Sequence, residues 1–371
     1  MPYAINPDRN IPWNGLPPIP IDPEYYRTIE IYEQLAKSRG ALGQLQGRSI
    51  AIPDQGMLIN TISLQEAKAS SAIENILTTD DELYKAFSDK LEEDGGSAKE
   101  VLRYREALWE GHAYLKTKRA FDRNYFISIY QQIKQASDSI RSASARIMIK
   151  QGGTGPNAGQ TVYTPPRGEN IVEEKLDNLI AFMNDDQSVA IDPLIKMAIA
   201  HLQFEAIHPF RDGNGRAGRI LNINYLTHLG QLDYPILYLS RHIILTKDEY
   251  YHRLAGVTQR GDWQNWILYM LRAIESTASL TYGKINSILD AIEDVKAVLI
   301  QAEVTRQDQL LKMLFTQPFI RVKHLTDAKI YAQNTARKYL SKLVELGVLE
   351  LKTIQGNHYY LNLELDRILS E

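Results

Sequence analysis

The chain has 371 residues, of which 44% are apolar and 23% are charged, with a formal net charge of −3 and no cysteine. That length suits two or three domains with a buried core, and the small net charge argues against broad attraction to nucleic acid or membrane surfaces. The missing cysteines exclude disulfides and thiolate chemistry. Neither a signal-type start nor an apolar run of about 18 residues is present, so we expect a cytoplasmic protein without a membrane partner.

Prolines recur through the first 23 residues and make this stretch unsuited to a helix. We expect an extended arm that Trp13 anchors to the body of the protein. From Pro23 to about residue 47, apolar residues recur at helical spacing, with an interruption expected near Gly40. The chain therefore begins with an anchored arm followed by helical structure.

Two capping-box patterns mark further helix starts. Ser63 is followed three residues later by Glu66, and Thr79 is followed by Glu82 at the same spacing. We expect mainly helical structure over residues 80–146, with an exposed acidic connection over residues 92–99.

Ser70 and Glu74 lie four residues apart within the first of these helices, so they share a face. Taken alone, the pair predicts a solvated helix face with a surface carboxylate.

A break in the helical pattern follows at residues 147–166. Two β-prone runs, residues 147–149 and 161–164, flank a loop of Gly, Asn and Pro, which predicts a β-hairpin. The glycines lack the spacing of a phosphate-binding P-loop, and no Lys follows Gly159, so that alternative is rejected.

Residues 201–230 hold the most informative stretch, two apolar-periodic segments around a short polar loop. Asp192 is a candidate N-cap for the upstream helix, with Pro193 at its first position. Gly230 stands where a C-terminal glycine cap ends the downstream helix.

The loop carries residues that suit an anion. Gly213 and Gly215 let backbone N–H groups approach a phosphate closely, and the following helix offers its unsatisfied N–H groups to the same spot. Arg216 and Arg219 project from one side of the first turn, and their guanidinium groups match phosphate oxygens.

The same loop carries a base and a hard metal ligand. His208 has an unperturbed pKa of about 6.5 and accepts a proton when neutral. Asp212 offers carboxylate oxygens of the kind that Mg²⁺ prefers beside phosphates. Base, metal ligand and phosphate clamp together predict nucleotidyl or phosphoryl transfer to a hydroxyl.

The sequence HPFRDGNGRAGR, residues 208–219, resembles the HPFx(D/N)GNGRxxR signature of the Fic (filamentation-induced-by-cAMP) family. The resemblance implies a mainly α fold, with a Fic-type helical core and a β-hairpin flap. It implies a protein adenylyltransferase that moves AMP from Mg²⁺–ATP onto a Ser, Thr or Tyr hydroxyl of a protein.

The resemblance also assigns roles to single residues. His208 would be the general base and Asp212 the Mg²⁺ ligand. The ATP-binding residues of the motif would be Gly213, Asn214, Gly215, Arg216, Gly218 and Arg219, with the two arginines on the β and γ phosphates.

Residues 70–75 are similar to the (S/T)xxxE(G/N) inhibitory motif that Fic proteins carry on a helix before the core. Ser70, Glu74 and Asn75 occupy its fixed positions. The resemblance implies that Glu74 pairs with Arg219 and holds the enzyme nearly off.

Two further segments resemble parts of Fic nucleotide sites. The predicted hairpin corresponds to the flap over the active site, which places Thr161, Val162 and Tyr163 near nucleotide and target. Tyr250 and Tyr251 resemble the lining of the adenine and ribose pocket, and Tyr251 is the preferred nucleotide contact.

The C-terminal pattern of three helices and a short hairpin is similar to a winged helix-turn-helix. Asn334 is the expected N-cap of its third helix, Gly347 a turn, and residues 355–357 the hairpin tip. Basic residues exceed acidic ones only slightly over residues 306–371, so DNA binding and a protein-interaction or dimerisation role both stay open.

We therefore predict three domains: residues 1–110 with the inhibitory motif, 111–285 as the catalytic core, and 286–371 as the winged-helix-like domain. The expected partners are ATP and an acceptor that is another protein or the chain itself, with a homodimer implied by the resemblance only. A de-AMPylating phosphodiesterase, transfer of another phosphate-containing group, and a nucleotide-sensing DNA-binding regulator remain alternatives.

Overall fold

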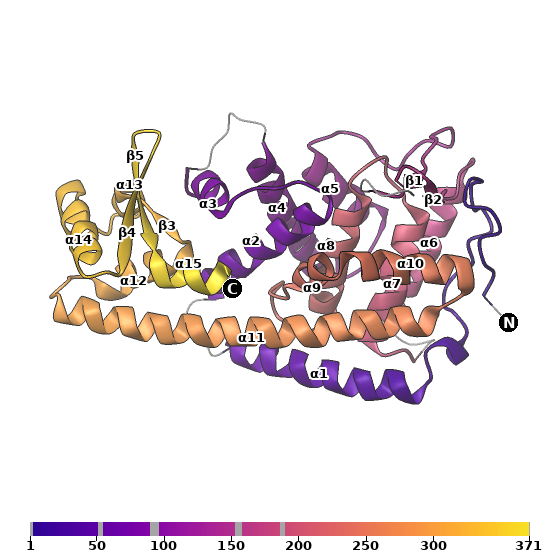
Figure 1. Ribbon diagram of the computed structural model, residues 1–371, viewed down its shortest axis with the longest axis horizontal. Helices are drawn as coiled ribbons and strands as arrows, with labels where there is room; N and C mark the ends of the chain where they lie inside the picture. Colours follow the sequence, from indigo (N-terminus) through magenta and orange to yellow (C-terminus); the bar gives the residue numbers. More distant parts are fainter. Residues whose placement is uncertain (1–2, 51–54, 90–95, 153–157, 186–189, 371) are drawn as a thin grey trace.

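The computed structural model describes residues 3–50, 55–89, 96–152, 158–185 and 190–370 (Figure 1). This part of the chain is mainly helical with two small antiparallel sheets, as predicted. Half of the expected acidic connection, residues 92–95, lies outside the described residues, and its end already belongs to a helix that begins at Ser97. Within the described ranges, no helix combines the length and apolarity needed to cross a membrane.

Helix α11 (Trp263–Gln301) runs along one side of the molecule from the core to the C-terminal elements (Figure 1). Helix α1 (Ile29–Ile50) packs against it, and Ser38 Oγ donates a hydrogen bond to the carbonyl of Leu271 at 2.8 Å. The expected interruption of α1 near Gly40 is wrong, because the buried Leu42 and Leu45 continue the apolar face that packs on α11.

The N-terminal arm lies on the body as predicted. Trp13 is buried, and its backbone N–H donates to the carbonyl of Thr164 at 3.0 Å. The short helix η1 (Pro23–Tyr25) precedes α1. The next helices after α1 are α2 (Gln55–Ile73), α3 (Asp80–Asp89), α4 (Ser97–Lys118) and α5 (Arg123–Lys134).

One of the two predicted capping boxes exists. The Thr79 N–H donates to Glu82 Oε2 at 2.9 Å and the Glu82 N–H donates to Thr79 Oγ1 at 3.2 Å, which starts α3. The box at Ser63 is wrong: α2 already begins at Gln55, and Glu66 is buried and bonds to other helices instead.

Helices α7 (Pro193–Ile207) and α8 (Asn214–His228) form the centre of the core. The Asp192 side chain accepts from the Leu194 N–H at 2.9 Å, so the predicted N-cap is confirmed. Gly230, with φ +66°, ends α8 in the left-handed conformation that the sequence predicts. Around this pair lie α6 (Ile171–Asn184), α9 (Leu239–Leu245) and α10 (Lys247–Arg260).

The predicted hairpin is confirmed in a shorter form. Strand β1 (Ile149–Lys150) pairs antiparallel with β2 (Thr161–Tyr163), with Ile149 opposite Tyr163. Residues 153–157 of its loop lie outside the described residues.

Four helices and a three-stranded antiparallel sheet follow α11 in the described part of the chain. Strand order is β3-β5-β4. Gln355 and Gly356, both with positive φ, make a two-residue turn, one residue shorter than the predicted tip, because Asn357 already pairs with Ile354. The predicted N-cap at Asn334 is wrong, since α14 begins one residue earlier and Ala332 precedes it. The elements are α12 (Gln307–Thr316), β3 (Phe319–Ile320), α13 (Val322–Asp327), α14 (Gln333–Glu345), β4 (Leu349–Ile354), β5 (Asn357–Asn362) and α15 (Leu363–Ser370).

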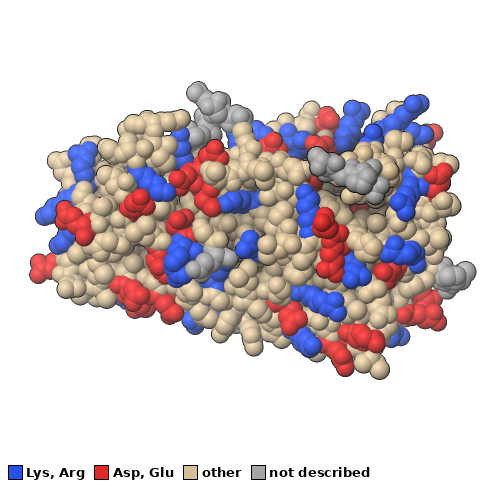
Figure 2. Space-filling model, in the orientation of Figure 1, with Lys and Arg blue, Asp and Glu red and all other residues tan. Residues whose placement is uncertain are grey.

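These C-terminal elements follow the predicted order, while the winged-helix interpretation stays a prediction. The face in Figure 2 shows Lys and Arg interspersed with Asp and Glu rather than a surface of one sign. That surface leaves DNA binding and protein interaction equally open. The predicted domain boundary at residue 285 falls inside α11.

Candidate active site

The predicted catalytic loop joins α7 to α8 and is fixed at both ends by backbone geometry. His208 caps α7 in the left-handed conformation, with φ 51°, and Gly213 precedes α8 with φ 75°. Between them, Phe210 is fully buried and stacks on Tyr130 with ring centroids 4.3 Å apart. The loop therefore presents its polar residues from a rigid anchor.

Asn214 closes this loop through its side chain. Its Oδ1 accepts from the Phe210 N–H at 2.9 Å, and its Nδ2 donates to the Phe210 carbonyl at 2.8 Å. The side chain of Asn214 is thus committed to the loop itself, although the resemblance assigns the residue to ATP binding.

His208 lies in an environment that keeps its ring neutral. Burial and the Arg141 guanidinium lower the pKa of His208 to about 4. At neutral pH the imidazole therefore carries no charge and is able to accept a proton.

Arg141 is a site residue that the sequence did not indicate. It is 3% exposed, its Nε donates to the His208 carbonyl at 2.8 Å, and its backbone N–H donates to the Pro209 carbonyl at 2.9 Å. Its Nη2 donates to the carbonyl of Pro166, just beyond the hairpin, at 2.5 Å. No local pattern marks a lone Arg in a loop, because all its partners are distant in sequence.

Asp212 fits a Mg²⁺ ligand by its chemistry. Its Oδ1 accepts from the Gly213 N–H at 2.7 Å and its Oδ2 accepts from Lys134 Nζ at 2.6 Å. Burial alone would raise the pKa of Asp212, but these hydrogen bonds outweigh it and hold the pKa below its usual range. A single ionised carboxylate beside a phosphate site suits Mg²⁺, which takes its remaining ligands from phosphate and water.

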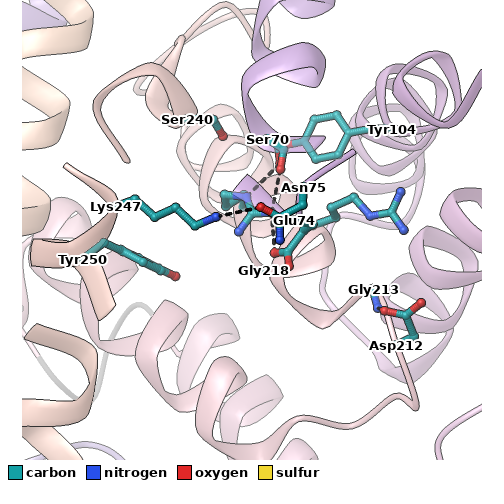
Figure 3. Close-up of polar contacts among 12 residues, drawn as sticks. Ser70, Glu74, Asn75, Tyr104, Asp212, Gly213, Gly218, Ser240, Lys247 and Tyr250 are labelled. Atoms are coloured by element: carbon teal, nitrogen blue, oxygen red, sulfur yellow. Dashed lines mark hydrogen bonds and ion pairs between the residues drawn. The ribbon is translucent and has the colours of Figure 1, made fainter. Parts of the chain in front are cut away.

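The two motif arginines are both buried, at 2% and 1% exposed, and each contacts a different carboxylate. Arg216 Nη1 lies 3.1 Å from Glu100 Oε2 on α4. Arg219 Nη2 donates to Glu74 Oε1 at 2.9 Å, which is the contact that the resemblance implies. Figure 3 shows Ser70, Glu74 and Asn75 gathered at the end of α2.

Ser70 adds two further hydrogen bonds to the same guanidinium. Arg219 Nε donates to Ser70 Oγ at 2.8 Å, and Arg219 Nη2 donates to the Ser70 carbonyl at 2.9 Å. Burial works against a charged guanidinium, but Glu74 outweighs it and raises the pKa of Arg219 above its usual value.

Asn75 explains the last position of the inhibitory motif. It adopts φ 62°, its N–H donates to the Ala72 carbonyl at 3.0 Å, and the Ile76 N–H donates to the Ser71 carbonyl at 3.0 Å. This is a Schellman cap, whose left-handed residue is Gly or Asn. Asn75 thereby ends α2 at the turn that carries Glu74.

Two glycines of the motif stand where a side chain would collide with these carboxyl groups. A Cβ on Gly215 would lie 2.3 Å from Glu74 Oε1, and a Cβ on Gly218 would lie 2.4 Å from Glu205 Oε1. Close approach of these carboxyl groups to α8 therefore needs glycine at both positions.

The two tyrosines of α10 differ in their accessibility. Tyr250 is 2% exposed, and its hydroxyl lies 2.8 Å from His201 Nε2, so it is part of the packing. Tyr251 is 43% exposed, which leaves its ring accessible for the nucleotide contact assigned to it.

The hairpin residues also differ. Tyr163 is buried and donates a hydrogen bond from its hydroxyl to the Ala206 carbonyl at 2.9 Å, which fixes the hairpin to α7. Thr161 and Val162 are half-buried.

Comparison with known families matches three parts of the sequence. Residues 32–113 match the Fic/DOC family N-terminal model, and residues 120–226 match the Fic/DOC family model. Residues 293–365 match the model described as protein adenylyltransferase SoFic-like, C-terminal domain.

Curated relatives include protein adenylyltransferase fic-1 of Caenorhabditis elegans, 31% identical over 130 residues, which are 35% of this chain and 24% of the relative. Protein adenylyltransferase Fic of Drosophila willistoni is 29% identical over 151 residues, 41% of this chain and 28% of the relative. The chain thus spans about a quarter of the length of these relatives.

Solved structures share the fold. A Fic family protein from Desulfovibrio desulfuricans has a TM-score of 0.56 at 19% identity, over 93% of this chain and 98% of that one. Residues 134–508 of Fic-1 from C. elegans have a TM-score of 0.52 at 20% identity, over 69% and 74%. Together with the matching family models and the loop of residues 208–219, these similarities show that the chain belongs to the Fic family.

Proposed function

We propose that this protein transfers AMP from ATP to a hydroxyl group of a protein. The observation that carries the proposal is the loop of residues 208–219, in which a neutral His208 lies at the end of one helix and two buried arginines start the next. The names of the matching relatives, protein adenylyltransferases, support the same reaction.

In the proposed reaction, the acceptor oxygen attacks the α phosphorus of ATP, a new P–O ester bond forms, and the bond to the departing pyrophosphate breaks. His208 takes the proton of the attacking hydroxyl. The N–H groups at the start of α8 and the guanidinium groups of Arg216 and Arg219 stabilise the negative charge on the phosphates.

Asp212 would hold Mg²⁺ together with the phosphates. The ion supplies charge neutralisation of the polyphosphate. Lys134, which bonds to Asp212 at 2.6 Å, has to release that carboxylate first. Lys134 is therefore a competitor of the ion for the Asp212 carboxylate.

We further propose that Glu74 inhibits this transfer. Its carboxylate bonds to Arg219 at 2.9 Å, and so occupies a donor that the terminal phosphate needs. ATP can then bind fully only after Glu74 has moved away from Arg219. Ser70 and Asn75 hold the segment that carries Glu74 in this position.

The position of the label in ATP tests the reaction. Glu74→Gly protein with added lysate should incorporate label from α-labelled ATP, and its incorporation from γ-labelled ATP should not exceed that of the lysate alone, whose kinases transfer the γ phosphate. A second substitution in this protein, His208→Ala, should abolish incorporation without unfolding the protein, because only the proton acceptor is lost. His358→Ala, which changes an exposed His on β5, is the matched control and should keep full incorporation. Incorporation of γ label above that of the lysate alone, or full incorporation of α label with His208→Ala, would refute the proposed chemistry.

A further inference from the structure

Glu205 is a half-buried residue at the active site to which the proposed reaction gives no role. It lies on the last turn of α7, three residues before His208. Its Oε1 is buried and has no hydrogen-bond partner among the described residues. A buried carboxyl oxygen without a partner is unfavourable, so a missing partner at this point needs an explanation.

The oxygen faces the start of α8. A Cβ on Gly218 would lie 2.4 Å from Glu205 Oε1, which places the carboxyl group against the residue before Arg219. Glu74 bonds to the guanidinium of Arg219 from the end of α2. The charge of Arg219 acts on Glu205 as it does on the buried Glu66 of α2, but of these three carboxyl groups only Glu74 bonds to the guanidinium.

The ionisation of Glu205 responds to both neighbours. Burial raises the pKa of Glu205 to about 7, Arg219 opposes this rise, and the charge of Glu74 adds to it. The hydroxyl groups of Tyr250 and Tyr251 also interact with Glu205, and the ring of His201 lies beside the same Gly218. Departure of Glu74 would remove a repulsion and leave Arg219 as the main influence, so Glu205 would ionise more readily.

The contacts of Arg219 show why a second partner is needed. Its hydrogen bonds within the described residues all go to α2 and the residue that ends it: two to Ser70 and one to Glu74. When Glu74 withdraws, a guanidinium that is 1% exposed keeps no bonded carboxylate. The two hydrogen bonds to Ser70 would remain, but a buried charge without a carboxylate partner is strongly unfavourable.

We propose that Glu205 is a positioning residue, which accepts a hydrogen bond from Arg219 once Glu74 has withdrawn and so orients the guanidinium toward the terminal phosphates of ATP. The guanidinium has five N–H donors in one plane, so one edge can bond to the carboxylate while another meets a phosphate. This inference rests on the proposed function, because it assumes that Arg219 binds those phosphates.

The test compares the binding of ATP and of AMP by calorimetry. The reference is Glu74→Gly, in which the inhibitory carboxylate is absent, and the variant adds Glu205→Gln, which keeps the size of the side chain. ATP affinity should fall about tenfold, because the charged partner of Arg219 is lost. AMP affinity should not change, because AMP lacks the phosphates that Arg219 contacts. Glu249→Gln, at the exposed partner of Arg253 on α10, is the matched control and should alter neither.

A double-mutant cycle ties the effect to Arg219. In a Glu74→Gly/Arg219→Ala background, Glu205→Gln should leave ATP affinity unchanged, because the group that Glu205 positions is gone. An equal loss of ATP and AMP affinity, or an effect that persists without Arg219, would overturn the inference. Unchanged ATP binding with Glu205→Gln would overturn the role of Glu205 and leave the proposed function standing. A Glu74→Gly protein that binds no ATP would overturn the proposed function as well.

Discussion

At the scale of single residues, burial decides the protonation state of the groups that matter most. Burial lowers the pKa of His208 to about 4 and that of His201 to about 3. A base whose pKa is that low is almost fully neutral at pH 7. The fraction that can accept a proton therefore does not depend on small changes of pH around neutrality. His112, which packs between α4 and α8 outside the site, has a pKa lowered to about 4 in the same way.

Because His112 lies outside the active site, it allows the lowering of a histidine pKa by burial to be measured with the active site unchanged. Its pKa is lowered in the folded state, so its stabilising contribution is present above about pH 6.5 and is lost as the pH falls toward 4. The unfolding free energy lost in His112→Gln should therefore shrink below pH 6.5, by about 1.4 kcal/mol for each pH unit. Urea unfolding of wild type and variant at pH 7.0 and about pH 5.5 measures it. A difference that stays constant between these pH values would contradict the assignment.

At the scale of elements, α2 and the residue that ends it carry the groups that bond to Arg219, and in the proposed inhibition they decide whether Arg219 is free to bind ATP. Its Schellman cap at Asn75 fixes the turn that carries Glu74. Two helical turns earlier, the buried Glu66 accepts hydrogen bonds from Tyr104 at 3.0 Å and from the Ser240 N–H at 2.8 Å. A polar residue in the packed interior thus ties α2 to α4 and α9.

Loosening this tie should loosen inhibition. In Glu66→Gln an amide replaces the carboxylate and accepts fewer of these hydrogen bonds, so α2 should move more easily. AMP transfer by the Glu74-containing protein should rise about threefold, since one hydrogen bond contributes on the order of 1 kcal/mol. In a Glu74→Gly background the same change should have no effect on the rate. Glu249→Gln, at the exposed partner of Arg253 on α10, is the control. Equal changes in both backgrounds would contradict a role through α2.

The elements also show which features a sequence reveals. The caps at Thr79 and Asp192, the end of α8 at Gly230 and the hairpin were predictable because each depends on neighbours within a few residues. The box at Ser63 failed because its pattern also fits a helix interior, where the tertiary partners of Glu66 decide the outcome.

Within the site, the same distinction holds. The contact of Glu74 with Arg219 was expected only through family resemblance, since the two residues are 145 positions apart. Arg141 and Glu205 were missed, because their importance comes from backbone carbonyls and glycines that folding brings beside them.

At the scale of the whole molecule, the C-terminal elements hold the helix that follows the inhibitory turn. Lys352 on β4 lies 2.9 Å from Asp81 at the start of α3, and His324 Nε2 lies 3.1 Å from the Ser88 carbonyl at its end. Phe319 and Tyr84 pack edge to face with ring centroids 5.8 Å apart. The turn of Glu74 is therefore bounded by α2 on one side and by an α3 that the C-terminal part holds in place.

In the proposed inhibition, contacts across the assembled chain, and not one ion pair alone, would hold Glu74 on Arg219. The central claim is that the structure holds an adenylyltransferase site whose Arg219 is occupied by Glu74. The measurement that tests it most directly is the initial rate of AMP incorporation from α-labelled ATP into lysate protein, for wild type and Glu74→Gly. Glu100→Ala, which removes the carboxylate from Arg216 instead, serves as the comparison.

We predict a rate at least about tenfold higher for Glu74→Gly than for wild type, as expected if a competing contact of 1.4 kcal/mol or more is removed. Glu100→Ala should not reproduce that increase, and His208→Ala should abolish incorporation by Glu74→Gly. Equal rates for wild type and Glu74→Gly, with both proteins folded and transferring AMP, would contradict the account.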